Sequence, residues 1–266
     1  MDTGVELVKT ASPPSRAAAW LRRFGGVVLD QLYPPLCLHC DAAIAHSDAL
    51  CGACFKLLRP ITAPLCPRLG IPFEVSIGPD ALSAEAIADP PPFERSRSAL
   101  IYTDVAGKLV GRLKYGDRPE LARFCARLMA GAGHELWRDD DPILVPVPLH
   151  RVRQFERRYN QSTELARALG AITGLKVDPL LVSRPRATRR QVGLSGDARQ
   201  RNVAGAFTAR ADAVSRTGGR RVVIVDDVIT TGSTVKAVTR ALNRAGIDHI
   251  NVISFARVVI GANPPI

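Results

Sequence analysis

The stretch from Arg221 to Leu242, RVVIVDDVITTGSTVKAVTRAL, decides the fold class of this chain. It opens with four apolar residues, Val222 to Val225, and so short a β-branched run predicts a buried parallel strand. The acids Asp226 and Asp227 follow, and after them comes a turn of small and hydroxylated residues. Beyond the turn a helix is expected, because apolar side chains recur at helical spacing, at Val235, Val238 and Leu242.

The order of strand, acidic pair, turn and helix is typical of a ligand-binding edge, because open α/β sheets bind ligands at the carboxyl ends of their strands. Backbone N–H groups of the turn and the positive end of the helix would form an anion site. Gly232 allows close approach of the backbone there. Two adjacent carboxylates repel a free phosphate and suit sugar hydroxyls better. The alternative is a solvated acidic turn before an N-capped helix. A Walker nucleotide site is excluded, since the sequence contains no GxxxxGK[ST].

The same stretch resembles the signature of type I phosphoribosyltransferases. That resemblance implies that Asp226 and Asp227 face the ribose hydroxyls of phosphoribosyl pyrophosphate (PRPP). It also implies that a loop wraps the 5′-phosphate, formed by Thr230, Thr231, Gly232, Ser233 and Thr234. Some members of that family carry a carboxylate where Thr230 stands, to manage a proton of the base, and this chain has none there.

Length and composition favour a folded, two-part protein. The 266 residues suffice for one moderate domain and a small one, and 46% hydrophobic residues support a core. The net charge of +11 suits a polyanionic ligand, nucleic acid or an acidic partner. No run reaches the length of a membrane span, and the acidic start does not resemble a signal peptide. We therefore expect a cytoplasmic protein without membrane insertion, whose six cysteines are reduced or metal-bound.

Four cysteines form a CxxC-x10-CxxC pattern: Cys37, Cys40, Cys51 and Cys54. This spacing predicts a tetrahedral Zn²⁺ site, which is structural because four thiolates leave no open position. A module this small needs the metal to complete its folding. The alternatives are four reduced core cysteines, a redox CxxC pair, or His39 or His46 in place of one thiolate. Cys66 and Cys125 are expected to be buried thiols.

The chain is predicted to have three parts: an N-terminal helix with the zinc module (1–61), a proline-rich connection (62–95) and a phosphoribosyltransferase-like domain (96–266). In the last part, strands and helices alternate, which predicts a parallel sheet flanked by helices. Strands are expected at 98–104, 143–147, 177–182, 222–225 and 251–259. Helices are expected at 16–32, 120–136, 163–169 and after the Thr-Gly turn, the last one stopping at Gly246.

Basic residues are concentrated between Arg151 and Gly205, where twelve Lys or Arg stand against four Asp or Glu. A solvated basic face is one interpretation of this density. The other is a surface for pyrophosphate or nucleic acid, since the planar fork of arginine binds phosphate bidentately. Few aromatic residues (5%) argue against a protein that binds single strands by stacking on their bases.

Several further segments are similar to the ComF family of competence proteins, which have a phosphoribosyltransferase-like domain. They are the CxxC pairs, Leu113 to Asp117, Val145 to Leu149, Arg157 to Gln161, scattered residues from Thr188 to Phe207, and the Asp-Asp loop. The chain departs from the family at Cys66-Pro-Arg-Leu69-Gly70, where many members have CPxCG. Because no later CxxC follows in the connection, a second zinc ion is not expected.

The resemblance implies a PRPP-binding protein and candidate enzyme, transferring or recognising phosphoribosyl groups by Mg²⁺-assisted displacement of pyrophosphate, with a link to DNA uptake in natural transformation. The pyrophosphate side is predicted to involve Lys114, Pro146, Val147, Pro148, Leu149, Arg151 and Arg153. The alternative is a non-catalytic accessory protein that binds PRPP or single-stranded DNA beside a DNA uptake helicase. The sequence identifies no catalytic residue, acceptor or oligomeric state.

Overall fold

The computed structural model describes residues 34–76, 78, 80–115, 120–150, 159–186 and 196–259, the side chains of 196, 197, 199 and 200 excepted. The chain divides into two compact units, residues 1–51 and 52–266. The predicted helix at 16–32 lies outside the described residues. Among the described residues, no helix has the length and apolar character needed to span a membrane.

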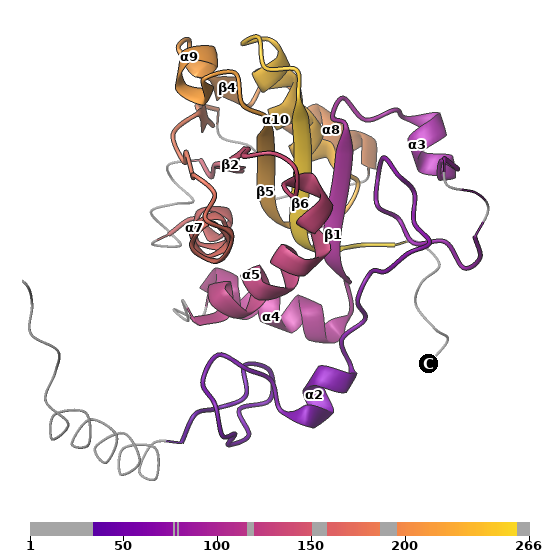
Figure 1. Cartoon of the computed structure of the whole chain (residues 1–266), viewed down its shortest axis with the longest axis vertical. Coiled ribbons are helices and arrows are strands. Elements are labelled where there is room, and N and C mark those ends of the chain that lie inside the picture. Colours follow the sequence, from indigo (N-terminus) through magenta and orange to yellow (C-terminus); the bar gives the residue numbers. More distant parts are fainter. Residues whose placement is uncertain are drawn as a thin grey trace, which may run out of the picture. The chain divides into compact units, whose positions relative to one another are not determined.

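A four-stranded parallel sheet forms the centre of the second unit, in the order β1-β6-β5-β2 (Figure 1). The strands are β1 (Arg95–Ile101), β6 (Ile250–Arg257), β5 (Val222–Ile229) and β2 (Ile143–Pro146). Nearly all their residues are buried, as is typical of parallel strands covered on both faces. The structure confirms the predicted α/β class with a parallel sheet flanked by helices.

Helices cover both faces of this sheet. The longer ones are α4 (Asp104–Tyr115), α5 (Glu120–Ala132), α7 (Gln161–Thr173) and α10 (Ser233–Asn243). On one face, Leu144 lies beside Gly170 of α7, and Ile253 lies beside Gly133 at the end of α5. The opposite face packs against α10 through alternate strand residues, namely Ile143, Val145, Ile224 and Val252. Shorter helices are α2 (Gly52–Lys56), α3 (Ala84–Ala88), α8 (Gly196–Val203), α9 (Ala213–Thr217) and the 3-10 turn His134–Leu136.

The strand expected at 177–182 is wrong. Val177 makes only an isolated parallel bridge to Leu144, and the side chain of Asp178 then accepts the N–H of Leu180 (3.0 Å), which turns the chain. Two residues further on, β3 (Val182–Ser183) pairs antiparallel with β4 (Thr208–Ala209). Local side-chain hydrogen bonding therefore overrides the apolar pattern.

Several boundaries also differ from the predicted ones. The helix expected at 120–136 ends at Ala132, before Gly133, and continues only as a 3-10 turn. Helix α7 is longer than predicted, because Asn160 caps its start and Gly174, at φ 78°, ends it. The last strand stops at Arg257 rather than residue 259, and α10 ends at Asn243, before Gly246. Helix α4, which starts at Asp104, is not among the predicted helices.

The predicted connection, residues 62–95, is folded within its described residues. It contains α3, and its Cys66, Leu69 and Phe93 belong to the same core as α10. Cys66 and Cys125 are fully buried, as predicted for these two thiols. Burial and the charge of Asp227 raise the pKa of Cys125, which therefore stays a neutral thiol.

Candidate functional site

The acidic pair lies within β5 rather than after it. The strand continues through both acids to Ile229 because its pairing with β6 continues, with Asp226 opposite Ser254 and Ile229 opposite Arg257. The expected end of the strand at Val225 is thus corrected. Both carboxylates are nearly buried, with Asp226 8% and Asp227 9% exposed. They lie near the carboxyl ends of the parallel strands, where such sheets bind ligands.

Asp226 is held from two sides. Its Oδ1 accepts the hydroxyl of Ser162 in α7 (3.1 Å) and the backbone N–H of Asp227 (2.9 Å). Burial, followed by the neighbouring charge of Asp227, raises the pKa of Asp226 to about 7, against the smaller opposing effects of these bonds and of Lys114. Near neutral pH this carboxyl therefore changes its charge readily.

Asp227 has a cationic partner. Nζ of Lys114, in the last turn of α4, lies 2.7 Å from its Oδ2, and the N–H of Val228 donates to its Oδ1 (2.8 Å). Lys114 was predicted on the pyrophosphate side, and the structure brings it against the acid pair. An ammonium beside two carboxylates lowers their mutual repulsion and keeps a positive charge at this edge.

The turn after β5 is shorter than predicted. Thr230, Thr231 and Gly232 connect the strand to α10, whereas Ser233 and Thr234 already form its first turn. Gly232 caps the helix in the left-handed region, at φ 76°, which favours glycine. The hydroxyls of Thr231 and Ser233 hydrogen-bond to each other (2.6 Å). Hydroxyls, a close backbone and a helix N-terminus are the elements of an anion site.

The predicted pyrophosphate segment, residues 146–149, begins at the last residue of β2 and lies beside the acid pair. Pro146, Val147 and Pro148 are buried and Leu149 is half-buried. The N–H of Val147 donates to the carbonyl of Val225 (2.9 Å), and its own carbonyl accepts Nδ2 of Asn160 (3.0 Å). The segment is therefore fixed to β5 and α7. Arg151 and Arg153 lie outside the described residues.

Sequence reasoning missed the role of the α7 start in ordering this site. Asn160 caps α7 by accepting the N–H of Ser162 (3.1 Å), and Tyr159 donates its hydroxyl to the carbonyl of Leu113, one residue before Lys114. An asparagine directly before a helical pattern, as at position 160, is a capping signal that can be read from the sequence. Only the fold brings Ser162 to Asp226, because 64 residues separate them.

A buried arginine at the same edge was also missed. Arg257 ends β6, opposite Ile229, and is only 6% exposed. Its Nε and Nη1 are buried without a hydrogen-bond partner. Burial lowers the pKa of Arg257 to about 10, and Glu85 and Cys66 oppose that change. The guanidinium still remains charged at neutral pH.

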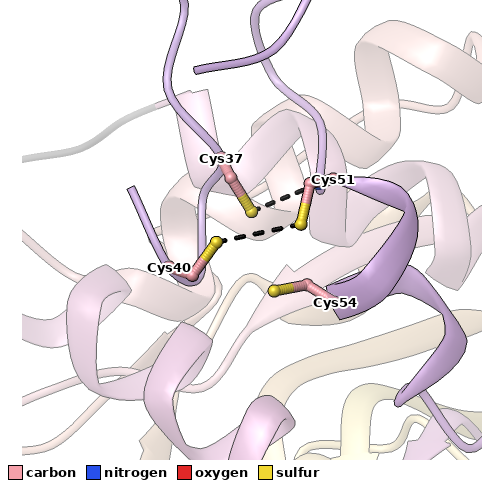
Figure 2. Close-up of side chains that lie close together, drawn as sticks. All are labelled: Cys37, Cys40, Cys51 and Cys54. Atoms are coloured by element: carbon pink, nitrogen blue, oxygen red, sulfur yellow. Dashed lines mark hydrogen bonds between the residues drawn. The ribbon is translucent and has the colours of Figure 1, made fainter. Parts of the chain in front are cut away.

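The four cysteines of the N-terminal pattern converge on one point (Figure 2). All four sulfur atoms lie within 4.8 Å of one another, and those of Cys40 and Cys51 are 3.8 Å apart. Four thiolates about 2.3 Å from a tetrahedral zinc ion would be about 3.8 Å apart, so the cluster fits the metal. The N–H of Cys51 donates to Sγ of Cys37 (3.2 Å). Burial opposes ionisation, but N–H donors from Cys40, Cys51 and His39 outweigh it and lower the pKa of Cys37 to about 6.

Comparison with known families agrees with both parts. Residues 28–87 match the double zinc ribbon domain, and residues 143–265 match the phosphoribosyl transferase domain. The fold and the site thus define a phosphoribosyltransferase-like protein with an N-terminal zinc ribbon. The family match and the four-cysteine geometry together support a structural zinc ion.

Individual relatives identify the family. The chain is 34% identical to "DNA utilization protein YhgH" of Salmonella typhimurium over 85% of its length and 98% of the relative. It is 29% identical to "Competence protein F" of Haemophilus influenzae (83% and 96%), and 23% identical to "Competence protein ComFC" of Bacillus subtilis (79% and 90%). This chain belongs to the ComF family.

Proposed function

We propose that this protein binds PRPP together with Mg²⁺ at the carboxyl edge of its sheet, and transfers or recognises the phosphoribosyl group. One observation carries the proposal: the nearly buried carboxylates of Asp226 and Asp227 lie near the end of β5, the strand that leads into the Thr-Gly turn and α10. Carboxylates that suit sugar hydroxyls are thus followed, within a few residues, by a turn that suits a phosphate. Membership of the ComF family supports this assignment.

Each part of the site has a separate task in this proposal. The carboxylates of Asp226 and Asp227 accept hydrogen bonds from the ribose hydroxyls, and Ser162 orients Asp226. The Thr230–Gly232 turn and the first turn of α10, with Ser233 and Thr234, bind the 5′-phosphate through N–H groups and hydroxyls. The positive end of α10, a helix of eleven residues, adds to the attraction.

On the pyrophosphate side, the cations Lys114, Arg151 and Arg153 and the backbone of residues 146–149 would hold the leaving group. In a transfer, the bond from C1′ to pyrophosphate breaks, pyrophosphate keeps the electron pair, and an acceptor forms the new bond to C1′. Fixed cations stabilise that departing charge. When the ligand binds, the ammonium of Lys114 would leave the carboxylate of Asp227 and contact pyrophosphate oxygens instead. The oxygen ligands here fit Mg²⁺, which when bound would neutralise part of the ligand's charge.

A non-catalytic role is the second candidate, and Thr230 favours it, because the chain has no carboxylate at the loop position where some phosphoribosyltransferases manage the base's proton. Relatives named for competence and DNA utilization then suggest an accessory protein of DNA uptake. In that role the pocket senses PRPP or a nucleotide end, and the basic surface engages single-stranded DNA or a helicase. A reduced four-thiol metal site suits a cytoplasmic location.

Calorimetric titration with PRPP and Mg²⁺ tests the binding site. The wild type should bind, and the double variant Asp226→Asn, Asp227→Asn should not. A wild type that binds no PRPP would overturn the proposal.

A product screen separates the two candidate roles. The protein is incubated with PRPP, Mg²⁺ and each nucleobase in turn, and pyrophosphate release is measured. Release with one base identifies an enzyme and its acceptor. PRPP binding without release, together with single-stranded DNA binding that survives the double aspartate substitution, identifies an accessory protein with two independent surfaces.

A further inference from the structure

Two segments of the chain share one backbone pattern, Pro35–Lys56 around the first zinc cysteines and Pro64–Ala88 around Cys66. In both, the cysteine N–H donates to the carbonyl five residues later (Cys37 to Ala42, Cys66 to Ile71, 2.8 Å each). In both, the N–H four residues after the cysteine donates back to its carbonyl, at 3.1 Å for Cys37 and 2.8 Å for Cys66. That fourth residue has positive φ in each copy, Asp41 at 61° and Gly70 at 64°.

The correspondence extends to the flanking chain. An antiparallel bridge joins the residue before the cysteine to the sixth after it, Leu36 to Ala43 in one copy and Leu65 to Pro72 in the other. The seventh residue after the cysteine donates its N–H to the carbonyl of the second residue before it (2.9 and 2.8 Å). The second segment is therefore a structural repeat of the first.

The second half of each copy aligns through the cysteine sulfur. Sγ of Cys37 accepts the N–H of Cys51 (3.2 Å), and Sγ of Cys66 accepts the N–H of Ser83 (3.4 Å). A five-residue helix starts at the next residue in both copies, α2 at Gly52 and α3 at Ala84. Counting along the copies, Leu69 stands where Cys40 stands, Ser83 where Cys51 stands, and Ala86 where Cys54 stands.

The donor set of the second copy does not fit a zinc ion. It offers one thiol, one hydroxyl and two alkyl side chains, whereas structural zinc requires four nitrogen or sulfur ligands. The hydroxyl of Ser83 accepts the N–H of Ala86 (3.3 Å) and caps α3. Sγ of Cys66 accepts N–H groups of Leu69 and Ser83, both at 3.4 Å. Each polar atom is thus satisfied by the protein itself.

Core packing takes the place of the metal in this copy. Cys66, Leu69 and Ala86 are 0%, 4% and 3% exposed, and they share a core with Phe93 and α10. Further bonds attach the copy, and the residue that follows α3, to the segment before β1 and to α10. Arg68 donates to the carbonyls of Pro91 (3.1 Å) and Phe93 (2.9 Å), and Nζ of Lys236 in α10 lies 2.6 Å from Oδ2 of Asp89.

We propose that residues 64–88 are a second zinc ribbon that has lost its metal and folds instead as part of the phosphoribosyltransferase-like core. The positions of Cys66, Leu69, Ser83 and Ala86 then form a latent zinc site, which three cysteine substitutions would restore. On this proposal, the backbone of the chain contains both ribbons of the double zinc ribbon domain, but only the first ribbon binds a zinc ion.

Zinc content per full-length chain, measured by elemental analysis of purified protein, tests the proposal. We expect one zinc in the wild type, one in Cys66→Ser and none in Cys37→Ser. The triple variant Leu69→Cys, Ser83→Cys, Ala86→Cys should hold two. Its matched control is Val75→Cys, Leu82→Cys, Ile87→Cys, which adds three thiols at exposed positions of the same segment and should hold one.

Cobalt substitution gives an independent readout, because the intensity of thiolate-to-cobalt absorption reports the number of coordinating thiolates. It should double only in the first triple variant. A wild type with two zinc ions, or a loss of one ion on Cys66→Ser, would overturn the metal-free assignment. A folded triple variant that still holds one ion would overturn the latent site. If that variant does not fold, the comparison of wild type with Cys66→Ser still decides the assignment.

Discussion

At the scale of single residues, the two adjacent acids have different surroundings and therefore different expected behaviour. Asp226 is bonded to neutral donors, whereas Asp227 is paired with the ammonium of Lys114. Burial and the neighbouring charge of Asp227 favour the neutral form of the Asp226 carboxyl. The pair therefore need not hold two full negative charges before a ligand arrives.

The raised pKa of Asp226 predicts a pH-dependent stability of the ligand-free protein. Folding shifts this pKa from 3.8 to about 7, so the contribution of its bound proton is complete below pH 4 and is lost as pH rises towards 7. Asp227 and Lys114 are the charged groups that face it. Asp226→Asn should abolish this slope and be more stable than the wild type at pH 8, by a few kcal/mol at most.

Urea unfolding at pH 5 and pH 8 measures this difference. Asp80→Asn, at an exposed acid, is the control and should keep the wild-type slope. Equal pH slopes for wild type and Asp226→Asn would show that the carboxyl titrates normally.

Lys114 is predicted to contribute to ligand affinity. Lys114→Met removes the cation from the acid pair and from the proposed pyrophosphate side, so PRPP should bind at least about tenfold more weakly. Calorimetry with PRPP and Mg²⁺ measures the change. Lys108→Met, at an exposed position of the same helix, should bind like the wild type. Tighter binding by Lys114→Met would instead mean that the lysine obstructs the site.

At the scale of elements, the turn between β5 and α10 sets the geometry of the proposed phosphate site. Gly232 lies at φ 76°, so Gly232→Ala strains the turn by about 1–2 kcal/mol and should weaken PRPP binding. Gly174→Ala is the matched control, because Gly174 has φ 78° at the end of α7 and open space around it. Both variants should lose similar stability in thermal unfolding, and only Gly232→Ala should lose affinity. Equal PRPP affinities would show that the turn does not bind the phosphate.

At the scale of the whole molecule, the net charge of +11 predicts salt-dependent binding of single-stranded DNA. If about four phosphates are contacted, affinity should fall roughly 50-fold between 50 and 200 mM salt. Fluorescence anisotropy with a labelled oligonucleotide measures the slope. The same titration with the double aspartate variant is the control for the proposed PRPP site. A flat salt response would exclude the basic residues as the binding surface.

The sequence by itself determined the class of the protein. Four consecutive apolar residues, an acid pair and a Thr-Gly turn predicted a buried parallel strand followed by a helix, and the CxxC spacing predicted a four-thiol cluster. These signals are local, because strand, turn and metal-knuckle chemistry depend on residues close together in the chain. A prediction from local sequence was wrong at 177–182, because the side chain of Asp178 turns the chain and ends the expected strand.

Only the tertiary structure decided which distant residues complete the site. Ser162 reaches Asp226, Lys114 reaches Asp227, and Arg257 ends beside the turn, although long stretches of sequence separate them. It also decided that Leu69, Ser83 and Ala86 occupy ligand positions, since without cysteines they carry no motif. In the first case, packing of the sheet and its helices sets the distances between residues far apart in the chain. In the second, backbone hydrogen bonds around Cys66 set the positions of these residues.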